Sequence, residues 1–240
     1  DRELVDGLLR QPIPIDYVAR AHNQEHSLEI QLPFLQVVLK EFKLTPVVLG
    51  DQSYSNCVRL AEAIAAVCGD KKVLLVASTD LSHFHPYGEA KRLDDRVLDR
   101  VTAFDPVGLS EDLRGGKCEA CGGGPLMTVM LAAQKLGANK SKVLQYANSG
   151  DVTGDSTSVV GYMSAVFYDN PGAAKSAGKA KTGKGNVDLG LSQEEKNALR
   201  ELAFQAIRSR CFGEPPPEFT TTSAKLRERR GAFVCIKKAG

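Results

Sequence analysis

The feature that most limits how this chain can fold is a run of small and basic residues late in the sequence. Residues 171–186 (PGAAKSAGKAKTGKGN) contain no large apolar side chain. Such a segment cannot bury enough apolar surface to offset the conformational entropy that ordering it would cost. We therefore expect a flexible linker over 170–190, with separate folded units before and after it. A basic tail that binds DNA is the alternative, but four lysines are few for that purpose.

The parts on either side of this linker differ in size. Residues 1–169 are enough for one domain. Residues 191–240 predict one helix, with Ser192 and Glu195 in the spacing of a capping box, and one strand at 231–236. One helix and one strand cannot enclose a core, so we expect 191–240 to be the start of an incomplete α+β domain. The first residue is Asp1 rather than Met, and we expect a fragment that lacks sequence at both ends.

The net charge of +2 conceals an uneven distribution. Residues 1–170 carry 17 basic and 22 acidic side chains, whereas the rest of the chain is basic. An acidic larger part disfavours a nucleic-acid partner. No run of about 18 apolar residues is present, so we expect no membrane span. Six cysteines are too few for a disulfide scaffold and favour a reducing compartment, which predicts a cytoplasmic protein.

Strand-like and helix-like patterns alternate along the larger part of the chain, which indicates an α/β architecture. Val73–Ala77 is a continuous apolar run, typical of a strand that is buried on both faces. Residues 1–23 are expected to be extended. The predicted helices are 26–42 (interrupted or started late by Pro33), 53–68, 88–104, a shorter one that begins at Asp105-Pro106, and one from Pro125 to Leu136. The predicted strands are 44–49, 73–77, 143–147 and 159–167.

A polar segment, STDLSH at 78–83, directly follows the apolar run at 73–77. Because ligands of α/β proteins bind outside the carboxyl ends of strands, Asp80 and His83 are candidates for a functional site. His83 would act there as a general acid or base, or as a metal ligand. In the structural alternative, Asp80 caps a helix and His83 lies on the surface.

Two further patterns carry candidate functional residues. Glu25 and His26 place a carboxylate beside an imidazole at the start of a predicted helix, where acidic residues also serve as ordinary caps. Cys118 and Cys121 have the CxxC spacing of redox or zinc sites, but neither a second CxxC nor a thioredoxin-like context accompanies them. Cys121 is the stronger candidate because it precedes three glycines and a helix start, where backbone N–H groups stabilise a thiolate.

Taken together and in order, five segments resemble the Memo-like family, also called AmmeMemoRadiSam system protein B. They are EHSLEIQLPFL (25–35), STDLSHF (78–84), CGGGPL (121–126), QYANSGD (145–151) and DSTSVVGYMSAVF (155–167). An ordered set of matches is more specific than any single motif. Two later segments, LSQEEKNALRELA (191–203) and LRERRGAFVCIKK (226–238), resemble the start of an AMMECR-type domain (system protein A), and the two families occur fused in this order.

The resemblance implies the α/β fold of class III extradiol dioxygenases, which is a mixed sheet with flanking helices. It also implies a redox metal, iron or copper, bound by two histidines and one cysteine. Cys121 would be that cysteine, His83 would match the acid/base histidine with Asp80 beside it, and His26 with Glu25 would line the site. The two histidine ligands belong to a Pro-His-Ala-Gly segment and a Ser-His segment upstream of the matched ones, and neither precedes them here. We therefore expect a missing upstream part, and no metal held by this chain alone.

Two functions of different kinds remain open at this point. The first is a metal-dependent oxidoreductase related to the dioxygenases, in which Cys121 binds the metal and His83 moves a proton. The second is a non-catalytic binding or scaffold protein that uses the same cleft. A thiolate in place of the carboxylate of the dioxygenase triad favours this second function, or at least a different reaction, because the ligand changes the metal preference and the potential. The expected partner in the cleft is a small molecule or peptide, and the name of the family that the chain resembles implies a link with a radical-SAM protein of the same system.

Overall fold

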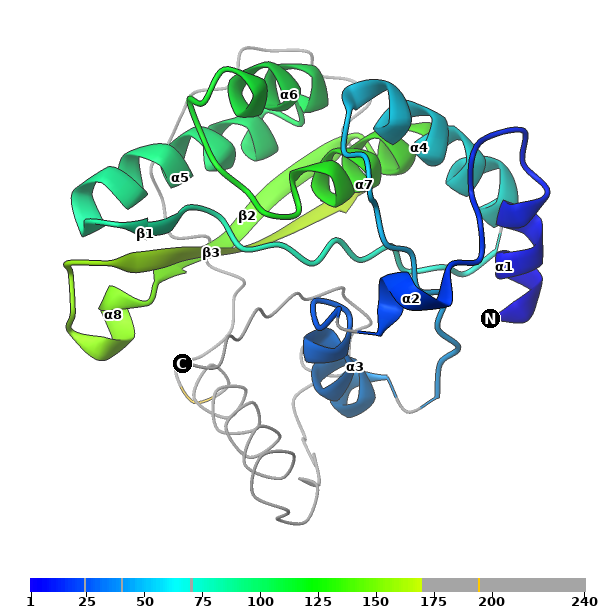
Figure 1. The fold of residues 1–240 in the computed structure, drawn as a ribbon, viewed down its shortest axis with the longest axis horizontal. Helices are drawn as coiled ribbons and strands as arrows, with labels where there is room; N and C mark the ends of the chain where they lie inside the picture. The colour runs from blue at the N-terminus through cyan, green and yellow to red at the C-terminus, as the bar shows by residue number, and fades with distance from the viewer. Residues whose placement is uncertain (24, 40, 70, 170–193, 195–240) are drawn as a thin grey trace.

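The described part of the chain is a layer of helices packed on a small antiparallel sheet, in a computed structural model (Figure 1). The structure describes residues 1–23, 25–39, 41–69, 71–169 and 194. The linker expected at 170–190 and the second domain expected at 191–240 therefore lie outside the described residues, apart from Glu194.

Among the described residues the sheet has three strands, in the order β1-β3-β2, and both pairings are antiparallel. β2 (Lys140–Asn148) and β3 (Val159–Tyr168) are joined through the short helix α8 (Gly150–Thr153). They pair from Lys140 opposite Tyr168 to Asn148 opposite Gly161. β1 (His83–His85) is short and pairs with the first residues of β3. The strands predicted at 143–147 and 159–167 are confirmed.

Four of the predicted helices are present, and they form one continuous layer. They are α4 (Tyr54–Cys68), α5 (Tyr87–Thr102), α6 (Pro106–Arg114) and α7 (Gly123–Lys135). α5 packs on β2 and β3, α6 packs on α5 and α7, and α7 packs on α4 (Figure 1). The start of α6 follows from local chemistry, because the Asp105 carboxylate accepts the Gly108 N–H at 2.8 Å and Pro106 stands in the first turn.

The hydrophobic core lies between these helices and the sheet. Its buried members are Cys57, Leu81, Val97, Val101, Leu109, Cys118, Leu126, Met127, Met130 and Ala165. Cys57 and Cys68 are buried, as expected for cysteines that act as small apolar residues. Leu81 is the one member from the polar segment at 78–83, and its burial fixes that segment against the core.

The prediction of extended structure for residues 1–23 is wrong at both ends of this range. Residues Arg2–Leu9 form α1 and Ala19–His22 form α2. α1 packs on α4 so closely that a Cβ on Gly7 would lie 2.7 Å from Val67 Cγ1. This contact between distant parts of the chain stabilises a helix that the short apolar pattern does not reveal.

The helix predicted at 26–42 is shorter than expected. A 3-10 turn, η1 (Glu29–Gln31), precedes α3 (Leu32–Val38), which has Pro33 in its first turn. Of the two effects predicted for Pro33, an interruption or a late start, the structure therefore has the late start.

The strands predicted at 44–49 and 73–77 are not strands in the structure. A strand requires a neighbour that completes its hydrogen bonds, and among the described residues neither segment has such a partner. Leu44 and Leu74 are exposed, and Leu74 retains 47% of its accessible surface. The burial on both faces that the apolar pattern predicted for 73–77 is therefore absent at Leu74.

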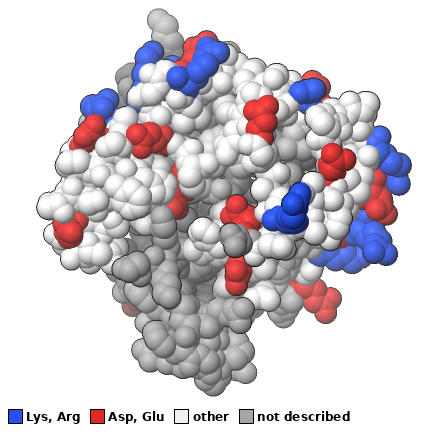
Figure 2. Space-filling model, viewed as in Figure 1, with Lys and Arg blue, Asp and Glu red and all other residues white. Residues whose placement is uncertain are grey.

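The surface of the described residues is mixed in charge. On the face shown in Figure 2, acidic side chains are scattered among uncharged atoms and most Lys and Arg side chains lie near the margins. No helix among the described residues is long and apolar enough to cross a membrane.

Candidate functional site

The polar segment at 78–83 runs beside the start of β3. The Leu81 N–H donates to the Gly161 carbonyl at 2.9 Å, and the Gly161 N–H donates to the Ser82 carbonyl at 3.0 Å. Leu81 and Ser82 are both fully buried. These contacts fix the backbone between Asp80 and His83, whose side chains remain partly exposed.

A second loop brings Cys121 against this segment. The Cys121 N–H donates to the Asp80 carbonyl at 3.1 Å, and the Asp80 N–H donates to Cys121 Sγ at 3.2 Å. The two segments cannot slide past one another without breaking both of these hydrogen bonds. The sulfur therefore has a fixed place next to Asp80, where it accepts a backbone N–H.

Gly122 makes this close approach sterically feasible. A Cβ at this position would lie 2.5 Å from the Ser78 carbonyl oxygen and 2.7 Å from Thr79 Cβ. Its N–H donates to Thr79 Oγ1 at 2.8 Å. Thr79 Oγ1 also lies 3.9 Å from Cys121 Sγ. The glycine is required here because the two loops touch, and Thr79 joins them with its hydroxyl.

Gln52 supports the same loop from the side of α4. Its Oε1 accepts the Gly124 N–H at 2.8 Å, and its Nε2 donates to the Cys121 carbonyl at 3.2 Å. Gly124 has no room for a Cβ, which would lie 2.7 Å from Gln52 Cβ. α7 therefore begins at a defined place directly after Cys121, as the glycine run predicted, and its positive N-terminal end faces the loop that carries the sulfur.

Asp80, His83 and Cys121 converge on one point. One ligand atom from each, a carboxylate oxygen, an imidazole nitrogen and a sulfur, all lie within 4.8 Å of one another. Asp80 Oδ2 is 3.4 Å from His83 Nε2. Imidazole and thiolate are ligands that iron and copper both accept, and carboxylate is a common ligand of iron. The donor set thus fits a transition metal, and the sequence had named each of these residues.

The other histidine of the HFH segment has a different environment. His85 Nε2 lies 3.0 Å from both carboxylate oxygens of Glu119, in the loop before Cys121, and His85 Nδ1 lies 3.8 Å from Glu89. These contacts join β1 to the CxxC loop and to the start of α5. His85 is therefore occupied by two carboxylates and does not belong to the cluster of Asp80, His83 and Cys121.

A β-bulge separates the two histidines. His83 pairs with Val160 and His85 with Val159, so one residue of β1 is extra, and this residue is Phe84, with a left-handed φ of 62°. Bulges re-aim side chains, often beside functional sites. The Phe84 ring is 70% exposed and meets the His83 ring edge-on, with 5.6 Å between the centroids. The bulge thus exposes an aromatic side chain next to the candidate site.

The two cysteines of the CxxC pattern have unlike environments. Cys121 is exposed, whereas Cys118 is 2% exposed and belongs to the hydrophobic core. Burial, assisted by the negative charge of Asp112, raises the pKa of the Cys118 thiol to about 11. Cys118 is thus held as a neutral thiol, an unfavourable form for a dithiol redox pair or a zinc ligand.

Glu25 and His26 are not part of the cluster. Glu25 Oε1 accepts the Ser27 N–H at 2.7 Å, and this hydrogen bond lowers the pKa of the Glu25 carboxyl. This contact lies just before the turn that precedes the 3-10 helix η1, whose N-cap Leu28 makes no side-chain hydrogen bond, so Glu25 does not act as a helix cap either. The link from this part of the chain to the site is made instead by Gln31, which is buried and donates from Nε2 to Ser78 Oγ at 2.9 Å.

Sequence reasoning missed the residues that support the site, namely Gln31, Gln52, Thr79 and Glu119. For Gln31 a signal was present, because an amide between Ile30 and Leu32 on a helix start is a polar side chain in apolar surroundings. Gln52 lies in a loop with no pattern of its own, and Thr79 belongs to the polar segment at 78–83, but its residue type gives no sign of a contact with the Cys121 loop. Their roles depend on contacts across more than 40 residues of sequence.

Fold and site together define an α/β protein that carries a candidate metal centre beside the edge strand of its sheet. Comparison with protein families then identifies it more closely. Residues 1–166 match the family described as Memo-like protein. The chain therefore belongs to the Memo-like family.

Curated relatives from archaea agree with this assignment. A "MEMO1 family protein" of Methanobrevibacter smithii is 44% identical over 169 residues, which are 70% of this chain and 60% of the relative. A "MEMO1 family protein" of Sulfolobus acidocaldarius is 40% identical over 172 residues, again 70% of this chain and 60% of the relative. "MEMO1 family protein MK0963" of Methanopyrus kandleri is 38% identical over 170 residues, with the same two shares. The chain thus spans about three fifths of the length of these relatives.

Proposed function

We propose that the whole protein carries out metal-dependent redox chemistry, with iron or copper bound by Cys121. The observation that carries this proposal is the convergence of Asp80, His83 and Cys121 within 4.8 Å. Three side chains with lone pairs at one place, one of them a cysteine that accepts a backbone N–H, are typical of a transition-metal site. A bound iron or copper ion would supply electron transfer or the activation of oxygen or substrate.

The residues of this chain would divide the remaining work. Cys121 would hold the metal, and the Asp80 N–H and the loop around Gly122 would keep its sulfur in place. His83 would hold or move a proton, and Asp80 would orient its imidazole, because Asp80 Oδ2 faces His83 Nε2 at 3.4 Å. Exclusion of water would be partial, since both side chains keep some exposure.

We propose further that two histidines outside the present 240 residues complete the metal site. Support comes from the resemblance, which implies two histidine ligands in upstream segments, and from the relatives, of which this chain spans about three fifths. His26 and Glu25 would then line the site from a greater distance. The AMMECR-type domain start at 191–240, a radical-SAM partner and a cytoplasmic location are further expectations of this proposal, and the four unpaired cysteines among the described residues suit a reducing compartment.

The decisive experiment is metal analysis of the whole protein purified without oxygen. We expect about one iron or copper ion per chain, which the Cys121→Ser variant should lose, with affinity falling about 100-fold. Cys118→Ala is the matched control, because it keeps the buried position apolar and should retain the metal. A protein that holds neither metal would overturn the redox proposal and support the alternative of a non-catalytic binding or scaffold protein. Loss of metal in Cys118→Ala but not in Cys121→Ser would instead restore a role for the buried thiol.

A further inference from the structure

One buried carboxylate of α5 has no role in the site as described so far. Asp94 is fully buried, whereas its neighbour Asp95 is half exposed and pairs with Lys91 on the surface. A buried carboxylate is costly unless strong donors reach both of its oxygens. The surroundings of Asp94 therefore indicate what holds it there.

Each oxygen of Asp94 accepts one hydrogen bond. The Ser82 N–H donates to Oδ1 at 2.9 Å, and the Tyr146 hydroxyl donates to Oδ2 at 2.7 Å. Burial, and then the hydrogen bond to Asp94, raise the pKa of the Tyr146 phenol, so that it stays protonated and remains a donor. Lys91 Nζ lies 5.0 Å from the centroid of the Tyr146 ring and adds a nearby positive charge.

Gly161 provides the space for this carboxylate. A Cβ at Gly161 would lie 1.9 Å from Asp94 Oδ2, so no other residue can stand there while Asp94 keeps its place. Gly161 is also the residue of β3 that exchanges hydrogen bonds with Leu81 and Ser82. Asp94 on one side and Gly161 on the other thus hold the same short piece of backbone.

That piece of backbone lies between two of the three converging side chains. Ser82 follows Asp80 by two residues and directly precedes His83. Its N–H is bonded to Asp94 and its carbonyl to Gly161, and Leu81 is anchored in the core. The directions in which Asp80 and His83 leave the chain are therefore determined by these contacts.

We propose that Asp94 is a positioning residue, which holds the Asp80–His83 segment in the conformation that faces Cys121. The inference rests on the proposed function, because the positioned segment belongs to the proposed metal site. The hydrogen bonds of Asp94 with Ser82 and Tyr146 themselves involve no metal. Without the carboxylate, the Ser82 N–H and the Tyr146 hydroxyl lose their acceptor in a buried place. The segment would then shift, and with it the Asp80 N–H that donates to Cys121 Sγ.

The first test measures Co²⁺ binding to the whole protein by the thiolate-to-metal absorption band, well below the unfolding temperature. Asp94→Ala should weaken Co²⁺ binding about 30-fold, and Asp94→Asn, which keeps an acceptor for Ser82, should recover most of that loss. Tyr146→Phe removes one hydrogen bond to Asp94 but leaves its carboxylate, and it should weaken Co²⁺ binding about 3-fold. This variant tests the positioning role of Asp94 if Asp94→Ala does not fold. Asp95→Asn, on the exposed side of the same helix, should bind as the wild type does.

The second test uses no metal and follows the alkylation rate of Cys121 by iodoacetamide, located by tandem mass spectrometry. Asp94→Ala should change this rate severalfold, and Asp95→Asn should not, because only the former releases the Asp80 N–H from the sulfur. The wild type could bind no Co²⁺ while Asp94→Ala still changes the alkylation rate of Cys121. In that case the metal proposal fails and the positioning role of Asp94 stands. Variants of Asp94 that unfold at lower temperature, yet keep wild-type Co²⁺ affinity and alkylation rate, would show a purely structural role and overturn the inference.

Discussion

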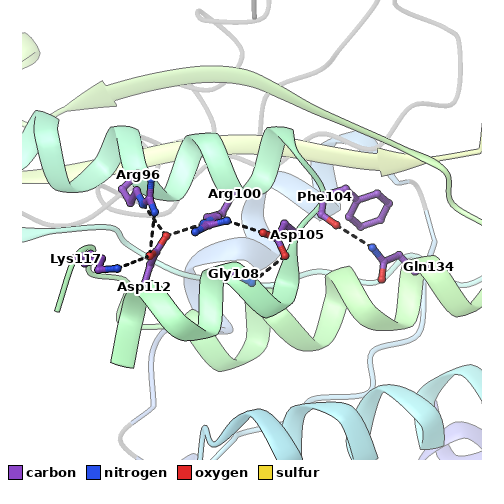
Figure 3. Close-up of polar contacts among 8 residues, drawn as sticks. All are labelled: Arg96, Arg100, Phe104, Asp105, Gly108, Asp112, Lys117 and Gln134. Carbon is purple, nitrogen blue, oxygen red and sulfur yellow. Dashed lines mark hydrogen bonds and ion pairs between the residues drawn. The ribbon is translucent and has the colours of Figure 1, made fainter. Parts of the chain in front are cut away.

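Two polar clusters of this protein, both formed by residues between Asp80 and Cys121, are built on opposite principles. Between α5 and α6, the buried Asp112 accepts from Arg96 Nε and Arg100 Nε, each at 2.6 Å (Figure 3). Arg100 continues from Nη1 to Asp105 at 2.6 Å, and Lys117 approaches Asp112 at 3.8 Å. In the cluster of Asp80, His83 and Cys121, by contrast, three groups with lone pairs point to a common place.

The first cluster has its charges paired within the protein, whereas we propose that the second one binds a metal ion. In the α5–α6 cluster the arginines supply the positive charge that the carboxylates need, and their hydrogen bonds, Arg100 first and Arg96 second, lower the pKa of Asp112 to about 2. Nothing further is required to stabilise that cluster. Three converging donors of the other kind gain most from a cation. The comparison thus predicts that changes near Cys121 affect metal binding and changes at Asp112 affect stability.

The largest expected effect is on metal affinity, in the Gly122→Ala variant. Its Cβ would lie 2.5 Å from the Ser78 carbonyl oxygen, so the Cys121 loop must move away from Asp80. We expect metal affinity to fall about 100-fold. Metal titration of the whole protein measures this, and Gly88→Ala is the control because a Cβ there meets nothing within 4 Å. An unchanged affinity in Gly122→Ala would remove the distinction between the two clusters.

Next in size is the effect of Asp112→Asn on stability. Loss of the charge leaves Arg96 and Arg100 without their shared carboxylate, and we expect the free energy of unfolding to fall by about 2 kcal/mol. Urea denaturation measures this, and Glu111→Gln, an exposed neighbour on α6, should change little. Metal affinity should stay at the wild-type value. A weaker metal site in Asp112→Asn would show that the two clusters are coupled.

Low pH should remove the contribution that the Asp112 charge makes to the free energy of unfolding. Because its folded-state pKa is lowered from 3.8 to about 2, its contribution is complete above pH 3.8 and is lost as the pH falls through about 2. The difference in free energy of unfolding between wild type and Asp112→Asn should therefore be constant from neutral pH down to about pH 4 and then narrow. A difference that stays constant at lower pH would show that packing, and not charge, makes the variant unstable.

The smallest expected effect compares two phenylalanines with left-handed backbone, Phe84 with φ of 62° and Phe104 with φ of 55°. Phe84 is exposed beside the site, whereas Phe104 stacks on Phe167 with 4.8 Å between ring centroids. Asparagine tolerates this backbone, so Phe84→Asn should raise the free energy of unfolding by about 0.5 kcal/mol. Phe104→Asn should lower it by about 2 kcal/mol, because it removes a packed ring. Thermal unfolding distinguishes the two, and destabilisation by Phe84→Asn would assign Phe84 a structural role.

Much of the fold could be predicted from local patterns. The helices α4 to α7 have apolar stripes, a cap at Asp105 or a glycine run before Pro125, and such signals act within a few residues. The apolar runs at 44–49 and 73–77 could not be assigned in this way, since a strand depends on partners elsewhere in the chain. α1 was missed for the same reason, as its stability comes from contact with α4.

The same distinction between local sequence patterns and contacts of distant segments applies to the candidate site. The sequence by itself determined which side chains are candidates for the site, because Asp80, His83 and Cys121 stand out by residue type and by their place after an apolar run or before a helix start. Only the tertiary structure decided that their ligand atoms meet within 4.8 Å, that Cys118 is a core residue, and that Asp94 holds the segment from behind. The physical reason is that residue chemistry is local, whereas distance and burial depend on contacts between segments that lie far apart in sequence.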